Sequence, residues 1–171
     1  MSHTYNFFYT DFKDNVELEH CLASRQPVYM IVENPPSQES IEELFSRYST
    51  PYYYFDLSDL ETFRPYLHQP LRDLNIDFME MPMSPGIIIG NILDEIDEAC
   101  GTKGRYSVVL NGFFNTNPLL QSSFAWQIRA FIQKHKHISY VFIGSNEYFD
   151  RFFQNQDEAF LQFATPIRVS S

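Results

Sequence analysis

The stretch from Val28 to Tyr48 constrains the fold most, because an uninterrupted apolar run leads directly into an amphipathic segment. Val28–Val32 has the length and composition of a strand that is buried on both faces of a sheet. Apolar side chains then recur at helical spacing, at Ile41, Leu44, Phe45 and Tyr48. Ser37 or Ser40 could cap this helix. The stretch therefore predicts a buried strand, a short loop and a helix.

Apolar runs and amphipathic segments continue to alternate along the chain. Further strands are predicted at Tyr52–Leu57, Arg105–Leu110, Ile138–Ile143 and Pro166–Val169. Helices are predicted at Asp11–Leu22, Gly86–Cys100, Pro118–His135 and Glu147–Phe153. Gly101 is expected to end the second of these helices, and the apolar side of the third is expected to include Trp126. Asp59–Asn75 shows helical spacing interrupted by prolines, and Asp77–Pro85 is predicted to be a loop.

This alternation predicts one α/β domain over residues 1–171. We expect three layers, with a mostly parallel sheet of about five strands covered by helices on both faces.

The charge of the chain limits its partners. Twelve basic residues against 22 acidic ones give a net charge of −10, which opposes direct binding to nucleic acid or to anionic membranes and favours a basic protein partner. The two cysteines suggest neither a disulfide framework nor a Cys-rich metal site, and no apolar run approaches the roughly 20 residues of a membrane helix. A cytoplasmic location is the expectation.

The loop after the first buried strand has the position of a phosphate-binding loop, G-x-x-x-x-G-K-[ST]. With Ser40 aligned to the hydroxyl position, Glu33 and Gln38 replace the two glycines and Glu39 replaces the lysine. The loop also contains Pro35-Pro36, which contribute no N–H groups. These residues predict a loop that repels polyphosphate.

With this order of elements, most of the chain resembles the P-loop ATPase domains of the AAA+ and STAND-related kind, above all the archaeal-type ATPases. The resemblance places the Walker A motif at Glu33–Ser40 and the Walker B motif at Val108–Gly112. It also implies a sensor-like strand end at Ser145 and Asn146. Asn111 and Gly112 stand where the family has its acidic pair, so the resemblance implies a P-loop NTPase-like fold whose catalytic groups are lost.

Simpler interpretations remain open for each of these positions. The Glu33–Ser40 segment could be an ordinary strand-to-helix loop, and Asn111-Gly112 could be a turn after a strand. Ser145 and Asn146 could cap a helix. His135 and His137 could form a metal pair or interact with a helix C-terminus, and Asp94, Glu95, Asp97 and Glu98 could form a solvated face. No metal, cofactor or catalytic nucleophile is predicted.

Two aromatic segments exceed what one strand face or one helix stripe can bury, Tyr52–Phe55 and Tyr148–Phe153. From them, Tyr53, Phe149, Phe152 and Phe153 are the candidates for a protein interface. The alternative is that these rings pack beneath neighbouring helices.

Three functional hypotheses follow. The first is a non-catalytic, pseudo-ATPase domain that binds another protein, either a basic protein or an active ATPase relative, with a homo-oligomer as an alternative assembly. The second is an unconventional nucleotide-binding protein or ATPase that uses Ser37, Ser40 and Ser145 with Lys103 or Arg105. The third is a small acidic inhibitor of the immunity-protein type, which would bind a basic partner in a salt-sensitive manner.

Overall fold

The computed structural model describes residues 9–11, 18, 20–21, 26–45, 52–57, 85–103, 106–114, 122–154 and 163–170. Its strands are β1 (Tyr9–Asp11), β2 (Val28–Ile31), β3 (Tyr52–Asp56), β4 (Tyr106–Phe113), β5 (Ile138–Gly144) and β6 (Thr165–Ser170). Its helices are α2 (Gln38–Phe45), α4 (Pro85–Lys103), α5 (Ser122–Ile132) and α6 (Asn146–Phe152). The predicted α/β class is confirmed.

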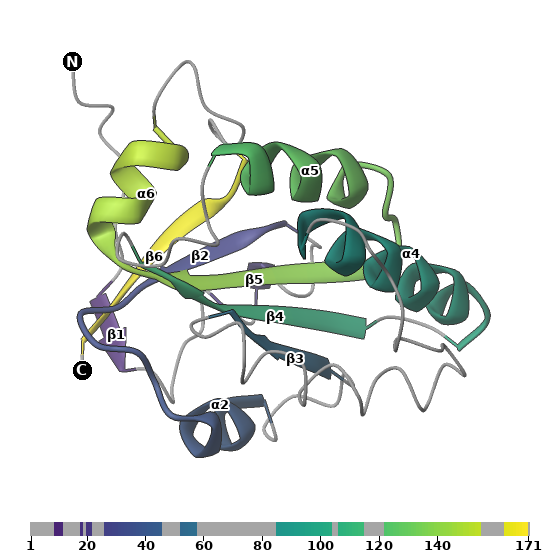
Figure 1. Ribbon diagram of the computed structural model, residues 1–171. Helices are drawn as coiled ribbons and strands as arrows, with labels where there is room; N and C mark the ends of the chain where they lie inside the picture. The colour runs from purple at the N-terminus through teal and green to yellow at the C-terminus, as the bar shows by residue number, and fades with distance from the viewer. Residues whose placement is uncertain are drawn as a thin grey trace.

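The six strands form one parallel sheet in the order β1-β6-β2-β5-β4-β3 (Figure 1). β2 lies in the interior, hydrogen-bonded to β5 on one side and to β6 on the other. All four residues of β2 are buried, as its continuous apolar run predicts. The chain order of the strands differs from their spatial order, so long crossovers bring the ends of β2, β4 and β5 together.

Helices cover both faces of the sheet, and each face has its own apolar cluster (Figure 1). Tyr29 and Ile31 point to the side of α4, α5 and α6, whereas Val28 and Met30 point to the side of α2. This alternation along β2 follows from the two-residue period of a strand. The three-layer architecture is thus confirmed.

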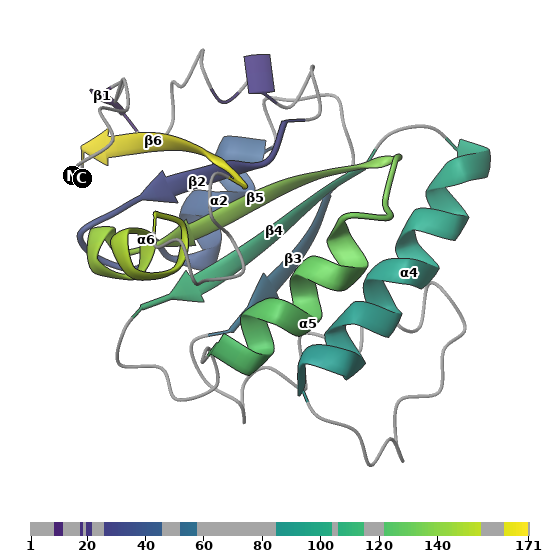
Figure 2. The same ribbon diagram turned by 90° about the horizontal axis from the view of Figure 1, so that it is seen from above.

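α4 and α5 lie side by side in the same direction over one face of the sheet (Figure 2). Their close approach depends on two glycines one helical turn apart. A Cβ atom at Gly86 would lie 2.2 Å from Oε1 of Gln127, and a Cβ at Gly90 would lie 2.0 Å from the ring of Phe131. These glycines let the first turns of α4 lie directly against the second half of α5.

Several predicted boundaries require correction. The short edge strand β1 was not predicted, because three residues cannot show an alternating pattern, and its last residue, Asp11, rules out a helix that begins there. β4 runs three residues beyond Leu110, and α4 continues past Gly101 to Lys103. Of the predicted helix Asp11–Leu22, the described residues Leu18, His20 and Cys21 are helical. The predictions for Asp59–Asn75 and for most of Asp77–Pro85 lie outside the described residues.

Trp126 does not belong to the apolar side of α5. The buried positions of this helix are Phe124, Ala125, Ile128 and Ile132, and Trp126 is 49% exposed. Two residues correspond to about 200° around a helix, so Trp126 and Ile128 point in nearly opposite directions.

Within the described residues, no helix is long and apolar enough to span a membrane.

Candidate functional site at the carboxyl edge of the sheet

The carboxyl ends of β2, β4 and β5 meet at one edge of the sheet, where open α/β sheets place their ligands. Backbone hydrogen bonds tie these ends together beyond the strands themselves. The N–H of Val32 donates to the carbonyl of Gly144 at 2.9 Å, and the N–H of Ser145 donates to the carbonyl of Phe113 at 2.9 Å. These two hydrogen bonds therefore hold the backbone of the strand ends in place.

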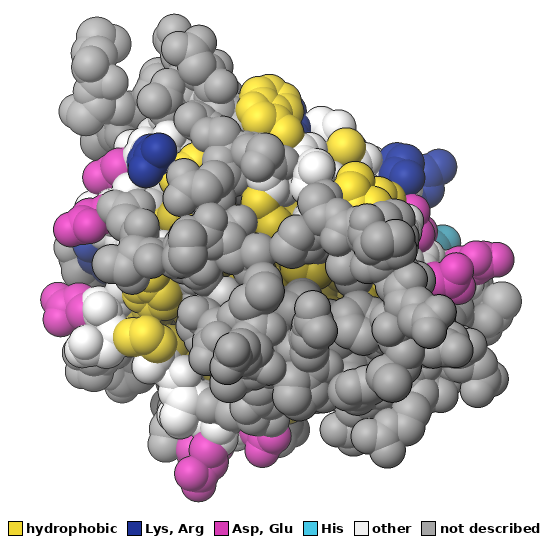
Figure 3. Space-filling view, in the orientation of Figure 1, with side chains coloured by type: hydrophobic (Ala, Val, Ile, Leu, Met, Phe, Trp, Pro, Cys, Tyr) yellow, Lys and Arg dark blue, Asp and Glu magenta, His cyan; other side chains and the backbone are white. Residues whose placement is uncertain are grey.

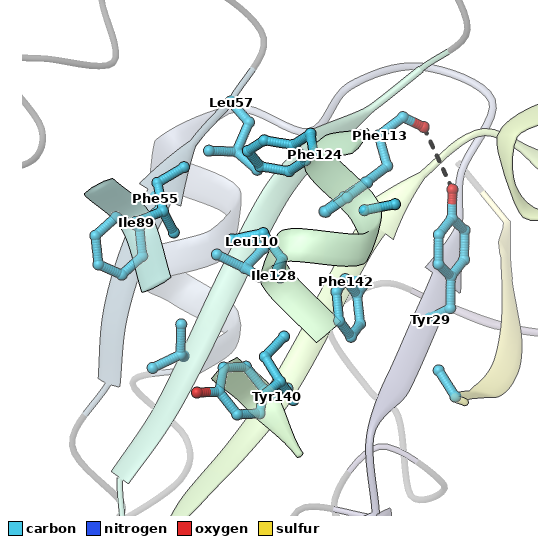
Figure 4. Packing of buried hydrophobic residues seen from close by; sticks show 14 of the residues in the cluster. Tyr29, Phe55, Leu57, Ile89, Leu110, Phe113, Phe124, Ile128, Tyr140 and Phe142 are labelled. Atoms are coloured by element: carbon cyan, nitrogen blue, oxygen red, sulfur yellow. Dashed lines mark hydrogen bonds between the residues drawn. The ribbon is translucent and has the colours of Figure 1, made fainter. Parts of the chain in front are cut away.

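Tyr29 contributes a side chain to the same junction (Figure 4). Its hydroxyl lies 2.9 Å from the carbonyl oxygen of Ser145 and 3.3 Å from that of Phe113, and it can donate to either. Its ring is fully buried against Phe149 and Phe153, with centroids 5.0 and 4.7 Å away. We did not predict from the sequence that Tyr29 joins the strand ends. The one signal for it in the sequence is a tyrosine hydroxyl within an otherwise apolar strand.

Burial raises the pKa of Tyr29 well above its ordinary value of 10.0, and the charges of Tyr148 and Asp150 raise it further. The folded state therefore holds this proton more tightly than the unfolded chain does. The resulting stability is complete below about pH 10 and is lost as the pH rises above that value.

Replacing Tyr29 by Phe is expected to reduce this alkaline loss and to lower the free energy of unfolding at neutral pH by about 1 kcal/mol, since one buried hydrogen bond disappears. Urea unfolding between pH 7 and pH 11 measures both effects. An unchanged dependence on pH in the variant would contradict the assignment to Tyr29.

The segment that the resemblance aligned with the Walker A motif, Glu33–Ser40, caps its own helix. The hydroxyl of Ser37 accepts from the backbone N–H of Ser40 at 3.1 Å, and the hydroxyls of the two serines are 2.9 Å apart. The carbonyl of Ser37 accepts from the N–H of Ile41, so Ser37 is the N-cap of α2. Ser40, aligned with the hydroxyl of the phosphate-binding motif, is thus bonded within the cap.

The charge at this helix terminus is negative. Glu39 lies in the first turn of α2, where a carboxylate interacts favourably with the helix dipole, and Glu33 is exposed at the start of the loop. Gln38 is the first residue of α2, and the structure describes its backbone but not its side chain. The positive end of the α2 dipole, which would attract a phosphate, is therefore already partly compensated by the carboxylate of Glu39.

Asn111 and Gly112 do not form a turn after the strand; that alternative is wrong. Both lie within β4, and the register with β5 is interrupted between Asn111 and Phe113. Gly112 has φ 117°, a conformation that favours glycine, so the Asn-Gly pair produces a bulge.

Asn111 is buried, with 3% exposure, and its Nδ2 donates to the hydroxyl of Tyr54 at 3.0 Å. Its Oδ1 is also buried, and it has no hydrogen-bond partner among the described residues. The position that the resemblance aligned with the Walker B motif therefore holds a neutral amide bonded to a neighbouring strand.

Ser145 and Asn146 are used within the fold. Ser145 is the N-cap of α6 and its hydroxyl accepts from the N–H of Tyr148 at 3.1 Å, so the capping alternative is confirmed. Asn146 is the first helical residue; its Oδ1 accepts from Nη2 of Arg168 at 2.8 Å and its Nδ2 donates to Asp150 at 3.1 Å. The sensor-like positions thus organise the start of α6.

The prediction that the phenylalanines of α6 form an exposed protein interface is wrong. Phe149, Phe152 and Phe153 are each 1% exposed, because α6 places them against Tyr29, Tyr148 and Phe142. Tyr53 is partly buried, and its ring stacks on Tyr106 with centroids 5.7 Å apart. The three phenylalanines belong to the apolar cluster between α6 and the sheet, and Tyr53 packs against that cluster from β3.

His135 is held between two helices and the sheet, away from the carboxyl edge. Its Nε2 lies 2.6 Å from Oδ1 of Asp94, its Nδ1 lies within hydrogen-bond distance of the Tyr140 hydroxyl, and its side chain is 2% exposed. Asp97 accepts from the backbone N–H of His137 at 3.1 Å. Asp94 and Asp97 are therefore not simply a solvated face; they attach α4 to the segment between α5 and β5.

Among the described residues, no three His, Cys, Asp or Glu side chains form a group that could hold a metal.

Lys103 ends α4 just before β4 begins, at the amino edge of the sheet. The eight residues of β4 separate its backbone from the candidate site by roughly 25 Å, at about 3.3 Å per residue. Lys103 is therefore poorly placed to serve Ser40 or Ser145, and Arg105 lies outside the described residues.

No protein-family model and no curated protein matches the sequence. Similar folds are found among solved structures. Cdc6p from Pyrobaculum aerophilum superposes with a TM-score of 0.53 at 14% identity, over 88% of this chain and 41% of its own. A Walker-type ATPase of Pyrococcus abyssi gives a TM-score of 0.55 at 8% identity, over 89% of this chain and 50% of its own. The chain thus has a P-loop ATPase-like fold and spans half or less of the length of these proteins.

Proposed function

We propose that this domain is a non-catalytic member of the ATPase fold that acts by binding another protein. The observation that carries the proposal is the local use of the polar groups at the carboxyl edge. Ser37 and Ser40 bond to each other, Ser145 caps α6, and Asn111 binds Tyr54. Groups committed in this way are poorly suited to hold a triphosphate and its metal ion.

Electrostatics supports the same proposal. Glu33 and Glu39 are exposed around the start of α2, and Glu39 stands where the phosphate-binding motif has its lysine. A carboxylate about 4 Å from a phosphate costs about 1 kcal/mol per pair of unit charges even at the dielectric constant of water. A triphosphate would meet this repulsion without a lysine at the position of Glu39 to offset it.

Titration calorimetry with ATP and Mg²⁺ tests the proposal. We expect no binding at micromolar concentrations and no phosphate release above the buffer rate, from either the natural chain or a Ser40→Ala variant. Micromolar binding by the natural chain would refute the proposal.

A second candidate, an unconventional nucleotide-binding protein, is favoured by one observation. Oδ1 of Asn111 is a buried acceptor without a partner among the described residues, and an unsatisfied acceptor costs about 1 to 3 kcal/mol. A ligand with a donor or a cation could satisfy it. Phosphate release that Ser40→Ala or Asn111→Leu abolishes would support this candidate against the first.

A further inference from the structure

Charge is segregated along this acidic chain. No aspartate or glutamate occurs between Glu98 and Glu147, whereas that tract contains Lys103, Arg105, Arg129, Lys134 and Lys136. The tract includes α5 and the turn after it. The net charge of −10 therefore does not describe the surface around α5.

One side of α5 faces outward with aromatic and basic side chains. It consists of Trp126, Arg129 and Ala130 on α5 with Gln133 and Lys134 in the turn that follows, hereafter the α5 ridge. The ammonium of Lys134 also pairs with Asp94 of α4, with 3.5 Å between Nζ and Oδ2. Trp126 is 49% exposed and is the exposed large hydrophobic residue among those described. In Figure 3 hydrophobic and basic side chains lie near one another along the upper side of the molecule, over the position of α5 in Figure 1.

Arg129 lies near two aromatic rings. Its guanidinium carbon is 5.7 Å from the centroid of Trp126 and 6.0 Å from that of Phe163. These two cation–π contacts restrain the planar group, which reduces the entropy lost when it binds a carboxylate. Tryptophan and arginine together are the residue types that dominate binding energy at protein interfaces.

We infer that the α5 ridge binds an acidic segment of a partner protein, with a carboxylate on Arg129 and apolar side chains on Trp126. This inference rests on the proposed protein-binding function and specifies the chemistry of one partner, with a sign opposite to that expected from net charge. Nucleic acid is disfavoured because a long phosphate backbone would extend beyond the α5 ridge and meet the overall negative charge of the chain.

The chain offers an internal reporter for this surface, since Trp126 is its single tryptophan. The probe is a synthetic helical peptide of glutamate, leucine and alanine, and its counterpart with lysine in place of glutamate is the control. We expect the glutamate peptide to shift the emission of Trp126 to shorter wavelength in a saturable manner that weakens with salt. The lysine peptide should have no such effect.

Arg129→Glu is expected to weaken peptide binding at least tenfold. Arg151→Glu is the matched control, because Arg151 stacks on Phe152 at 4.8 Å in the same way but lies on α6. Its affinity should stay within about twofold of the natural chain, in line with the small effect of charges outside an interface.

Absence of saturable binding, equal responses to the two peptides, or equal losses in the two variants would overturn the inference. So would tighter binding of single-stranded oligothymidylate than of the glutamate peptide, or burial of Trp126 by concentration-dependent self-association. Calorimetry with ATP separates the two claims. Micromolar binding of ATP would contradict the proposed function. If neither ATP nor the glutamate peptide binds, only the inference about the α5 ridge is contradicted.

Discussion

Replacing Gly144 by Ala is expected to lower the free energy of unfolding by about 3 kcal/mol, near the upper end for overpacking in a core. A Cβ atom at this position would lie 2.2 Å from the carbonyl oxygen of Phe113 and 2.3 Å from the hydroxyl of Tyr29. The first of these atoms belongs to the backbone of the neighbouring strand, so no side-chain rotation relieves the contact. β4 and β5 would have to separate where they end. Urea unfolding followed by far-UV circular dichroism measures the loss.

A double-mutant cycle with Tyr29→Phe shows whether the loss arises at this junction. Removing the hydroxyl relieves one of the close contacts of the new methyl group, so Gly144→Ala should cost less in the Tyr29→Phe background than in the natural chain. Additive losses would show that Tyr29 does not meet the new methyl group. A Gly144→Ala variant as stable as the natural chain would contradict the described strand ends.

Replacing Phe149 by Ala is expected to cost about 3 to 5 kcal/mol, because a fully buried ring is lost and a cavity remains. Phe149 packs against Tyr29 and stacks on Phe153 at 5.4 Å, so its loss also weakens the attachment of α6 to β2. The midpoint of guanidinium unfolding measures the change. Phe149→Leu, which retains much of the volume, should fold with a smaller loss and remains measurable if Phe149→Ala is unfolded.

Trp126→Ala is the matched control for Phe149→Ala, since it removes an aromatic ring from the surface of α5 rather than from the core. We expect its unfolding midpoint to stay close to that of the natural chain, because surface substitutions usually change stability by less than about 0.5 kcal/mol. If Phe149→Ala were neutral and Trp126→Ala strongly destabilising, the assignment of core and surface aromatic residues would be reversed.

Regular patterns predicted the architecture well. The runs at Val28–Val32 and Ile138–Ile143 correspond to β2 and β5, and the predicted helix Gly86–Cys100 lies within α4, which buries Ile89, Ile92 and Ile96. Such patterns succeed because burial on one or both faces leaves a two-residue or 3.6-residue period in the sequence itself. The resemblance to P-loop ATPases predicted the fold for the same reason.

Aromatic side chains were harder to place. Phe149, Phe152 and Phe153 exceed one helix stripe, and this suggested exposure, yet Tyr29 and Phe142 on the sheet provide surface that covers them. Trp126, predicted to be buried, is exposed. Periodicity indicates which residues share a face, but the width of that face depends on which neighbours pack against it.

The sequence by itself determined the alternation of strands and helices, the negative charge of the loop after β2, and the absence of acidic residues from the tract around α5, because each is a local property of the chain. Only the tertiary structure decided how distant groups pair. It joined Asn111 to Tyr54, Tyr29 to the end of β5, and Asp94 to His135. The physical reason is that hydrogen bonds between residues far apart in the chain depend on strand order and helix packing, which leave no periodic mark in the sequence.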